Sequence, residues 1–429
     1  MTARLLTISL VLLLLIPAAC AGDTDPATSL PGSASAAPSA GGIASPSGAR
    51  DPSRSPGTSE ASSPGPSADP EPTPDPRVES ALAGLDSDDE LVGQLLLIGW
   101  AGRDAAAARE AIHTLRPGGI VFIANASTAD RAAALNVGLD GVAAEGGLVP
   151  LLKTIDHEGG AIQRIEDVEN LGSNRDFAAS DPAVDEACQR GAVHARQLLE
   201  MGFEMNLAPV LDVNTNPDNP VIGPRSYGAR PQLVARLGAA YIRGLRSGGI
   251  VAVGKHFPGH GDTGIDSHLD LPVLGFGRRR LDDIELVPFV NAIAPETGLA
   301  AVMTAHIALP RIDPSGLPAT LSEPIISGIL RRDLGFDGLV LSDDMAAMAA
   351  ITDDFEPGEA AVMAIGAGVD MLIVGGDLER QTTMRDALLG ALASGDLERE
   401  RVTDAVRHVL AAKAAAGLLG GEPTVSPGC

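Results

Sequence analysis

Along most of the chain, short apolar runs alternate with longer stretches whose apolar residues recur with a helical period. The apolar runs predict eight buried strands, at Leu95–Gly99, Gly119–Ala124, Leu151–Asp156, Glu204–Asp212, Gly249–His256, Leu299–Ile307, Gly338–Asp343 and Val369–Gly375. The clearest amphipathic helices are predicted at Val184–Met201, Pro231–Ser247, Arg280–Ala292 and Glu323–Leu334. Eight such units predict an α/β fold of the (β/α)8 TIM-type barrel class, with its chemistry on the loops that follow the strands. A doubly wound open sheet is the alternative.

The N-terminal 20 residues have the pattern of a secretory signal peptide. Arg4 precedes the apolar run Leu5–Ile16, which is too short to span a bilayer comfortably and is followed by small residues and Cys20. This ending resembles a bacterial lipoprotein box, which implies that Cys20 is lipidated and anchors the protein to the outer face of the cell membrane. Pro17 departs from the Leu that is usual in such boxes. Cleavage near Ala19 and release from the membrane is the alternative.

Residues 21–77 are mostly Ser, Pro, Ala, Gly and Asp, with almost no large apolar side chain. Such a segment cannot bury enough surface to offset its ordering entropy, so we predict a disordered linker. The single folded domain is expected at residues 78–417, and residues 418–429 are expected to form a disordered tail.

The net charge of −25 lies mostly on residues 78–429. Such a surface repels polynucleotides, so nucleic acid is not expected as a partner. The three cysteines, Cys20, Cys188 and Cys429, do not suggest a disulfide framework. We expect Cys188 to be a buried small side chain on a helix, and the sequence offers no partner for Cys429. We also expect a monomer.

Polar side chains gather where five consecutive predicted strands end. Each group has a structural alternative, such as a turn cap for Asp212 or a satisfied core histidine for His306. Five such groups at one end of a barrel favour a reaction site. They are Asp156-His157-Glu158 with Arg164, Asp212 with Arg225, the stretch from Lys255 and His256 to Asp270, Thr304-Ala305-His306, and Ser342-Asp343-Asp344.

The run Lys255-His256-Phe257-Pro258-Gly259-His260-Gly261-Asp262-Thr263, followed by Asp266-Ser267-His268, resembles the glycoside hydrolase family 3 β-N-acetylglucosaminidases. The resemblance covers about residues 80–415 and includes Asp156–Gly160, Gly223–Gly228, Val302–His306 and Ser342–Met345. It implies a (β/α)8 barrel that removes terminal β-GlcNAc from peptidoglycan-derived fragments with retention, without a cofactor or metal. A β-GlcNAc oligosaccharide or muropeptide is the implied substrate.

The resemblance also implies roles for individual residues. Asp343 would be the nucleophile that forms a glycosyl-aspartate intermediate, and His268, paired with Asp266, would be the general acid/base. His157 and Met345 stand where relatives often carry Gln and Leu. Many family members take the acid/base from a second domain, which this sequence lacks, and this favours the branch that uses histidine. The implied ligands of the sugar are Asp156, Arg164, Arg225, Lys255 and His256.

The chemistry is consistent with these residue types. A retaining glycosidase needs a carboxylate on one face of the sugar and a proton donor on the other. An unperturbed imidazole has a pKa of about 6.5, and Asp266 would fix the tautomer of His268. We expect the glycines Gly259, Gly261 and Gly264 to let this loop swing. A salt bridge that only stabilises the loop is the alternative for Asp266 and His268.

Other functions stay open at this point. Because imidazole does not repel an incoming anion, phosphate could replace water and release GlcNAc-1-phosphate. A β-glucosidase or β-xylosidase of the same family, and a non-catalytic lipoprotein that binds wall glycan, are further alternatives. A metal hydrolase would use the side chains of the histidine-rich stretch, although their spacing matches no known metal site. Those side chains are His256, His260, Asp262, Asp266 and His268.

Overall fold

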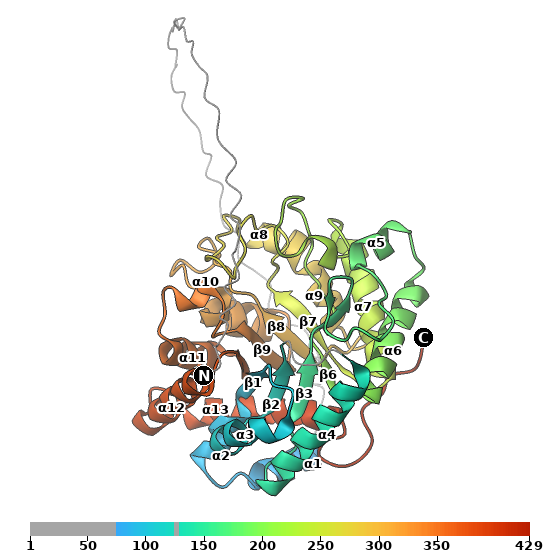
Figure 1. Ribbon diagram of the computed structural model, residues 1–429. Helices are drawn as coiled ribbons and strands as arrows, with labels where there is room; N and C mark the ends of the chain where they lie inside the picture. Colours follow the sequence, from blue (N-terminus) through green and yellow to red (C-terminus); the bar gives the residue numbers. More distant parts are fainter. Residues whose placement is uncertain (1–73, 124–127) are drawn as a thin grey trace, which may run out of the picture. The chain divides into compact units, whose positions relative to one another are not determined.

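The computed structural model describes residues 74–123 and 128–429, and a closed barrel of eight parallel strands lies at their centre (Figure 1). Because β1 pairs with both β2 and β10, the sheet closes on itself. The predicted (β/α)8 barrel is thus confirmed, and the open sheet is wrong. Around the barrel, the strands are β1 (Leu96–Trp100), β10 (Met371–Val374), β9 (Leu339–Asp344), β8 (Ala301–Thr304), β7 (Val251–Phe257), β6 (Met205–Asn206), β3 (Leu152–Ile155) and β2 (Gly119–Phe122).

Each of the eight predicted apolar runs overlaps one barrel strand, and β1, β7 and β9 extend one residue beyond the predicted end. The run Glu204–Asp212 gives only two residues of regular strand, and Pro209 within it has no N–H for the ladder. β1 ends at Trp100, the chain's single tryptophan, whose carbonyl oxygen accepts a hydrogen bond from the N–H of Ile123. A hairpin that the sequence pattern did not predict follows β3 and consists of β4 (His157–Gly159) and β5 (Ile162–Gln163).

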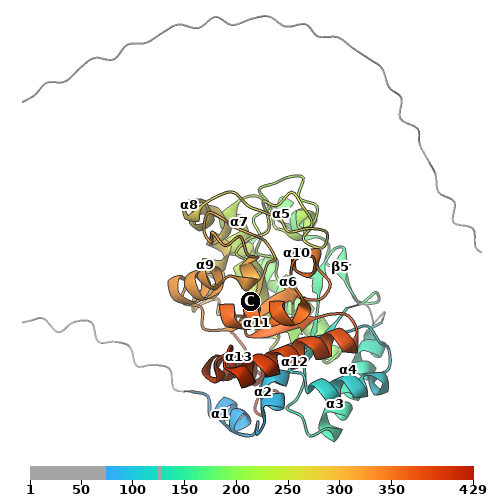
Figure 2. The same cartoon turned by 90° about the vertical axis from the view of Figure 1, so that its left-hand side faces the viewer.

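Helices surround the barrel, and α11, α12 and α13 lie together on the flank shown in Figure 2. The α-helices are α1 (Pro76–Ala83), α2 (Asp88–Gln94), α3 (Arg109–Leu115), α4 (Ala129–Glu145), α5 (Asn174–Ala179), α6 (Val184–Glu200), α7 (Pro231–Ser247), α8 (Arg278–Arg280), α9 (Val287–Ile293), α10 (Ala349–Thr352), α11 (Pro357–Ala367), α12 (Leu378–Ser394) and α13 (Arg399–Ala415). Shorter or irregular turns are the 3-10 segments η1 (Ala105–Ala108), η2 (Gly223–Arg225) and η4 (Ala319–Leu321) and the π segments η3 (Leu281–Glu285) and η5 (Pro324–Asp333).

Local sequence explains several helix ends. Ser87 and Glu90 form a capping box, in which each side chain accepts the backbone N–H of the other, so α2 begins at Asp88. The predicted helices Val184–Met201 and Pro231–Ser247 correspond to α6 and α7. The predicted helix Arg280–Ala292 is divided into the end of α8, η3 and α9, because Pro288 cannot donate a helical hydrogen bond. The stretch predicted at Glu323–Leu334 forms η5.

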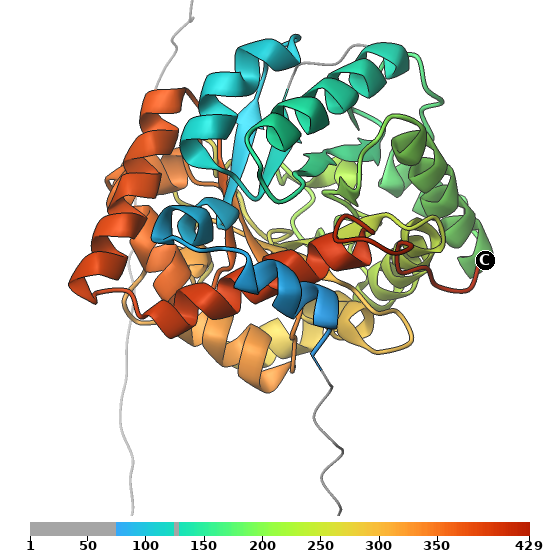
Figure 3. The same ribbon diagram turned by 90° about the horizontal axis from the view of Figure 1, so that it is seen from below.

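The barrel interior is filled with apolar side chains, and α13 closes one end. The C-terminal helix α13 crosses the end where the strands begin (Figure 3). Its Lys413 is fully buried, and Nζ donates to Gln94 Oε1 at 2.6 Å. Burial lowers the pKa of Lys413 to about 7. The side chains packed together inside include Leu97, Val121, Leu152, Met205, Val253, Met303, Leu341, Met371 and, from α13, Val409 and Ala412.

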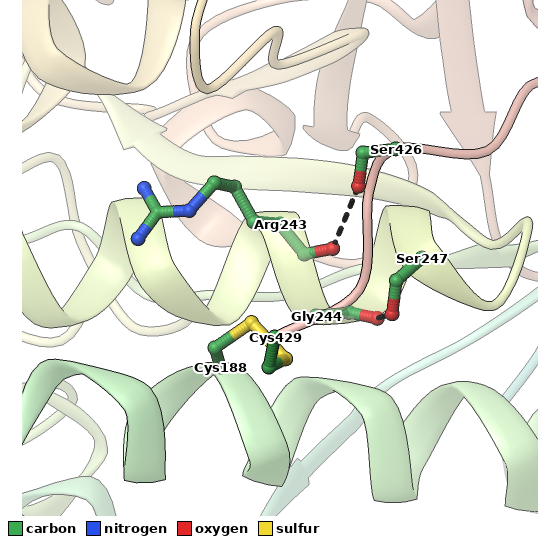
Figure 4. Close-up of a disulfide and its surroundings, with 6 residues drawn as sticks. All are labelled: Cys188, Arg243, Gly244, Ser247, Ser426 and Cys429. Carbon is green, nitrogen blue, oxygen red and sulfur yellow. Dashed lines mark hydrogen bonds between the residues drawn. A yellow bond between two sulfur atoms is a disulfide. The ribbon is translucent and has the colours of Figure 1, made fainter.

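A disulfide between Cys188 and Cys429 corrects the prediction for both cysteines (Figure 4). The two residues are 241 positions apart, and the fold brings their Cα atoms to 5.7 Å. Spacing alone could not reveal this pair, because α6 and the tail meet only after the barrel has closed. The tail forms no regular helix or strand, but Ser426 donates to the carbonyl oxygens of Arg243 and Arg246. These bonds and the disulfide attach the tail to α7 and α6, whereas the sequence predicted a disordered tail at residues 418–429.

Several expectations concern residues outside the described ranges. Cys20, the signal peptide, residues 21–73 of the linker and Ala124 of the predicted strand Gly119–Ala124 lie there. The first described helix begins at Pro76, two residues before the expected domain start at residue 78. Within residues 74–123 and 128–429, we find no helix whose length and apolar character would let it cross a membrane.

Candidate active site

A cavity of about 360 Å³ lies at the carboxyl ends of the strands. Asp156, Arg164, Arg225, Lys255, His256, His268 and Asp343 all line it, so seven of the eight side chains predicted to act on the sugar meet in one place. The eighth, Asp266, contacts His268 from outside the lining. The remaining walls come from Val121, Phe122, Ile123, Ile162, Leu207, Val221, His260, Ser267, Met303, Asp344, Ala347 and Ile373.

Carboxylates and cations alternate along one wall of this cavity. Lys255 Nζ lies 2.7 Å from Asp156 Oδ1 and 2.6 Å from Glu158 Oε1. Arg225 donates to both oxygens of Glu158, through Nε at 2.9 Å and Nη2 at 2.8 Å. Arg164 lies farther out, with Nη2 3.7 Å from Asp156 Oδ2. The wall thus presents fixed donors and acceptors at defined positions, as recognition of sugar hydroxyls requires.

Glu158 organises these cations, although sequence reasoning gave it no role. Burial would raise the pKa of Glu158, but Arg225 and Lys255 outweigh burial and hold that pKa well below its usual range. Burial would likewise lower the pKa of Lys255, yet Asp156 and Glu158 raise it above its ordinary value. The three groups therefore stay charged near neutral pH. The available signal was the position of Glu158 two residues after Asp156, in the hairpin that the pattern missed.

Asp212 holds two histidines that line the cavity, His256 and His260. Its Oδ2 lies 2.7 Å from His256 Nδ1, and its Oδ1 accepts the backbone N–H groups of His256 and His260. Burial would raise the pKa of Asp212, but His256 and His260 lower it below its ordinary value. With Nδ1 turned to Asp212, His256 presents Nε2 toward Arg225 Nη2 at 3.5 Å. The sequence reasoning treated Asp212 only as a strand end.

Asp343 and Asp344 both line the cavity at the end of β9, but their surroundings differ. Burial would raise the pKa of Asp343, yet His256, His306 and the N–H of Asp344 lower it below its usual value. Asp344 instead accepts the N–H groups of Ala346 and Gly375, and burial raises its pKa. Asp343 is therefore the carboxylate held ionised, while Asp344 shapes the turn that follows.

His268 lies on the loop that follows β7 and, unlike Lys255 and Glu158, is exposed to solvent. Its side chain is 58% exposed, and Nδ1 lies 2.8 Å from Asp266 Oδ1, which also accepts the N–H of His268. Burial would raise the pKa of Asp266, but its contacts with His268 lower that pKa below the ordinary value. An ionised carboxylate thus fixes the imidazole, whose Nε2 is left for another partner.

The loop carrying His268 is anchored more firmly than its glycines suggested. Gly261 packs so closely that an added Cβ would lie 2.0 Å from the carbonyl oxygen of Val213, and one on Gly259 would meet Glu285 at 2.7 Å. Both glycines therefore allow close packing at these two points, and the expected loop movement stays a prediction. Gly264 is different, since a Cβ there would meet only Asn216 Nδ2 at 3.8 Å. Of the three glycines, Gly264 is therefore the one where a side chain would meet only an ordinary contact.

The histidine-rich stretch has little capacity left to bind a metal. The ring nitrogens of His260 lie 2.8 Å from Thr263 Oγ1 and 3.0 Å from Ser267 Oγ. Burial lowers the pKa of His260 to about 4, so the ring is neutral near pH 7. In the part of the chain that the structure describes, no three His, Cys, Asp or Glu side chains are placed to hold a metal ion.

Known proteins share this sequence and barrel. Residues 88–412 match the model of the glycosyl hydrolase family 3 N terminal domain. Beta-hexosaminidase LpqI of Mycobacterium tuberculosis is 32% identical over 343 residues, which cover 78% of this chain and 84% of that protein. Beta-hexosaminidase A of Pseudoalteromonas piscicida is 31% identical over 360 residues, 75% of this chain, and the chain spans only 60% of its length.

A solved structure is similar at the level of the fold as well. A glycoside hydrolase family 3 beta-N-acetylglucosaminidase from Paenibacillus sp. str. FPU-7 is 42% identical, with a TM-score of 0.75. The match covers 80% of this chain and 65% of that one. Because the family model spans most of the chain and both the barrel and its carboxyl-end cavity are in place, the protein belongs to glycosyl hydrolase family 3.

Proposed function

We propose that the protein is a retaining exo-β-N-acetylglucosaminidase that removes terminal GlcNAc from peptidoglycan-derived fragments. One observation carries the proposal: a carboxylate held ionised, Asp343, and an exposed imidazole fixed by a carboxylate, His268, line the same cavity. Retaining glycosidases need these two functions on opposite faces of one sugar ring. The names of the relatives and of the similar structure support the choice of GlcNAc.

The reaction has two steps. Asp343 attacks the anomeric carbon, the glycosidic C–O bond breaks, and His268 gives its proton to the leaving oxygen. The neutral imidazole then takes a proton from water, whose oxygen displaces Asp343 from the anomeric carbon and releases GlcNAc. Asp266 stabilises the imidazolium before the first step and after the second. Asp156, Arg164, Arg225, Lys255 and His256 hold the hydroxyls and the N-acetyl group.

Aryl β-GlcNAc and aryl β-glucoside substrates test this proposal directly. Asp343→Asn should lower kcat on aryl β-GlcNAc by about 10⁴-fold or more, and His268→Ala by about 10²- to 10⁴-fold. Asp337→Asn is the matched control, because Asp337 is 92% exposed and precedes β9 at its other end. Wild-type turnover that both substitutions leave intact would contradict the assignment, and preference for the glucoside would favour the β-glucosidase alternative. No turnover of either substrate would favour the wall-glycan-binding lipoprotein.

The same preparation distinguishes hydrolysis from phosphorolysis. His268 is exposed and, as an imidazole, does not repel an anion as a carboxylate would. Products formed on aryl β-GlcNAc in high phosphate should therefore be separated by chromatography. Free GlcNAc alone supports a hydrolase, whereas GlcNAc-1-phosphate supports the phosphorylase alternative.

We further propose that the protein acts outside the cytosol, attached to the membrane through a lipid on Cys20. The disulfide between Cys188 and Cys429 supports this, because such bonds persist mainly in oxidising compartments. Cys20→Ala should shift the protein from the membrane fraction to the soluble fraction. In cells fed labelled fatty acid, the wild type should carry the label and the variant should not. Equal fractionation of both forms would contradict anchoring at this residue.

A further inference from the structure

Apart from the cavity at the carboxyl ends of the strands, here called the sugar cavity, a second cavity of about 500 Å³ lies between α5, the segment 214–217 and the beginning of α7. Its lining includes Ala178, Tyr227 and Leu233 together with two arginines, Arg175 and Arg230. No acidic residue is part of that lining in the portion of the chain that the structure describes. Nothing in the proposed reaction uses this cavity.

Both arginines lack a side-chain partner among the described residues. Most arginines in the described ranges contact a carboxylate or a carbonyl oxygen, but neither Arg175 nor Arg230 has a partner there. The chain has a net charge of −25, so two free cations in one cavity stand out locally. Guanidinium groups bind carboxylates in a paired, planar geometry. The combination with apolar lining residues suits a carboxylate that is attached to a small apolar group.

One segment connects the two cavities. Arg225 lines the sugar cavity, while Tyr227, two residues later, lines the second cavity. Their Cα atoms can be no more than about 7 Å apart. Three residues of extended peptide span about 10 Å, which exceeds this separation, so a short peptide on the leaving part of a bound glycan is long enough to cover it. In Figure 1, α5 lies at the same end of the barrel as α8, which follows β7.

We infer that Arg175 and Arg230 bind a carboxylate on the aglycon, such as that of a short peptide carried by the sugar next to the cleaved GlcNAc. This inference rests on the proposed function and names the part of the substrate that lies beyond the scissile bond. It makes the second cavity a specificity site, since both arginines lie outside the residues assigned to the chemistry.

Two substrates that differ only in charge test the inference. Each is a GlcNAc–MurNAc disaccharide with the same dipeptide, in one case with free carboxylates and in the other with amides. The Arg175→Ala/Arg230→Ala double variant should raise KM for the free acid about 10-fold, with each single variant raising it about 3-fold. Values of kcat, and KM for the amide, should stay unchanged. Arg236→Ala, an exposed α7 arginine outside the cavity, is the matched control.

Titration of both compounds into the Asp343→Asn variant gives a readout that does not require turnover. Weaker binding of the free acid after the arginine substitutions, with amide binding unchanged, supports the inference even if the wild type hydrolyses neither compound. Equal effects on acid and amide, or no effect on either, overturn it. If the wild type hydrolyses neither compound, that result counts against the proposed function and not against the binding site.

Discussion

Glu158 shows how one side chain sets the geometry of a binding wall. Its carboxylate contacts Lys255 Nζ and accepts hydrogen bonds from Nε and Nη2 of Arg225, and it is almost fully buried. A buried carboxylate and its two cations stabilise one another as a group, because removing one member leaves an uncompensated buried charge. The positions of Lys255 and Arg225, the proposed sugar ligands, therefore depend on a residue that does not line the cavity itself.

Glu158→Gln should lower the free energy of unfolding by about 3 kcal/mol and raise KM several-fold, because two buried cations lose their counter-charge. The pKa of Glu158 lies below its unfolded value, so its contribution is present above about pH 4.5 and is lost only as pH falls through the lower folded value. Urea denaturation at pH 7 measures the difference. Glu166→Gln, an exposed neighbour, should leave stability within about 0.5 kcal/mol, and similar losses in both variants would contradict this role.

Asp266→Asn should lower kcat about 10- to 100-fold with little change in KM, because the amide cannot stabilise the imidazolium of His268. Steady-state kinetics on aryl β-GlcNAc gives the two constants separately. Asp270→Asn is the control on the same loop, since the Asp270 carboxylate accepts only the N–H of Leu271 among the described residues. An unchanged kcat in Asp266→Asn would support the alternative, in which Asp266 and His268 form a salt bridge that only stabilises the loop.

At the level of elements, the loop from Gly259 to His268 consists of two parts. Its first part is bound to the segment after β6, where Asn219 donates to the carbonyl oxygen of His260 and Asn216 to that of Thr263. Its second part is exposed and meets α10, whose Ala349 and Ala350 donate to carbonyl oxygens of the loop. The anchored part aligns His260 with Ser267, so the position of His268 depends on packing at the base of the loop.

Gly261→Ala should lower kcat/KM about 10- to 100-fold and stability by about 1–3 kcal/mol, because the new Cβ would overlap the carbonyl oxygen of Val213. Gly264→Ala has ordinary space and should leave stability within about 1 kcal/mol. Thermal melting combined with kinetics separates the two effects. Equal tolerance of both substitutions would mean that the first part of the loop is not fixed by this contact.

At the scale of the whole molecule, Asp370 joins distant parts of the chain at the closed end of the barrel. Its buried carboxylate accepts Arg331 from η5 at 2.5 Å and Arg401 from α13 at 2.6 Å, and lies 3.1 Å from His408 Nδ1. Burial would raise the pKa of Asp370, but His408 and the two arginines lower it below the ordinary value. Its stabilising effect is therefore present above about pH 4 and is lost as pH falls through the lowered pKa.

Asp370→Asn should lower the free energy of unfolding at pH 7 by about 3 kcal/mol, because buried cations lose their partner. Asp404→Asn is a close control, since Asp404 contacts the same Arg401 but is 53% exposed, and should cost less than about 1 kcal/mol. Below pH 4, the stability of Asp370→Asn should fall less steeply than that of the wild type. Parallel pH curves from urea denaturation would contradict the assignment.

The disulfide between Cys188 and Cys429 closes a loop that includes most of the barrel. Cys429→Ser should lower the free energy of unfolding by about 2–5 kcal/mol, since the unfolded chain regains the freedom that the cross-link removes. Thermal melting with and without a thiol reductant tests this, because reduced wild type should then match the variant. A variant as stable as the oxidised wild type would contradict a stabilising role.

The sequence predicted the barrel and most of its site for a physical reason. Buried parallel strands leave continuous apolar runs, and the polar residue at the end of each run must face the open end, as Asp156, Lys255 and Asp343 do. Contacts that form only between distant segments left no such signal. The pairing of Glu158 with Arg225, of Asp370 with Arg401, and of Cys188 with Cys429 each depends on closure of the barrel.

The position of Trp100 gives this protein a built-in optical probe. It is the single tryptophan of the chain, it ends β1, and its carbonyl oxygen accepts a hydrogen bond from Ile123, which lines the sugar cavity. Indole emission therefore reports on one place, the end of β1, where the backbone of Trp100 contacts a residue of the cavity wall. If sugar binds in this cavity as proposed, a fluorescence titration can follow it in unlabelled protein, and stopped-flow mixing can give its rate.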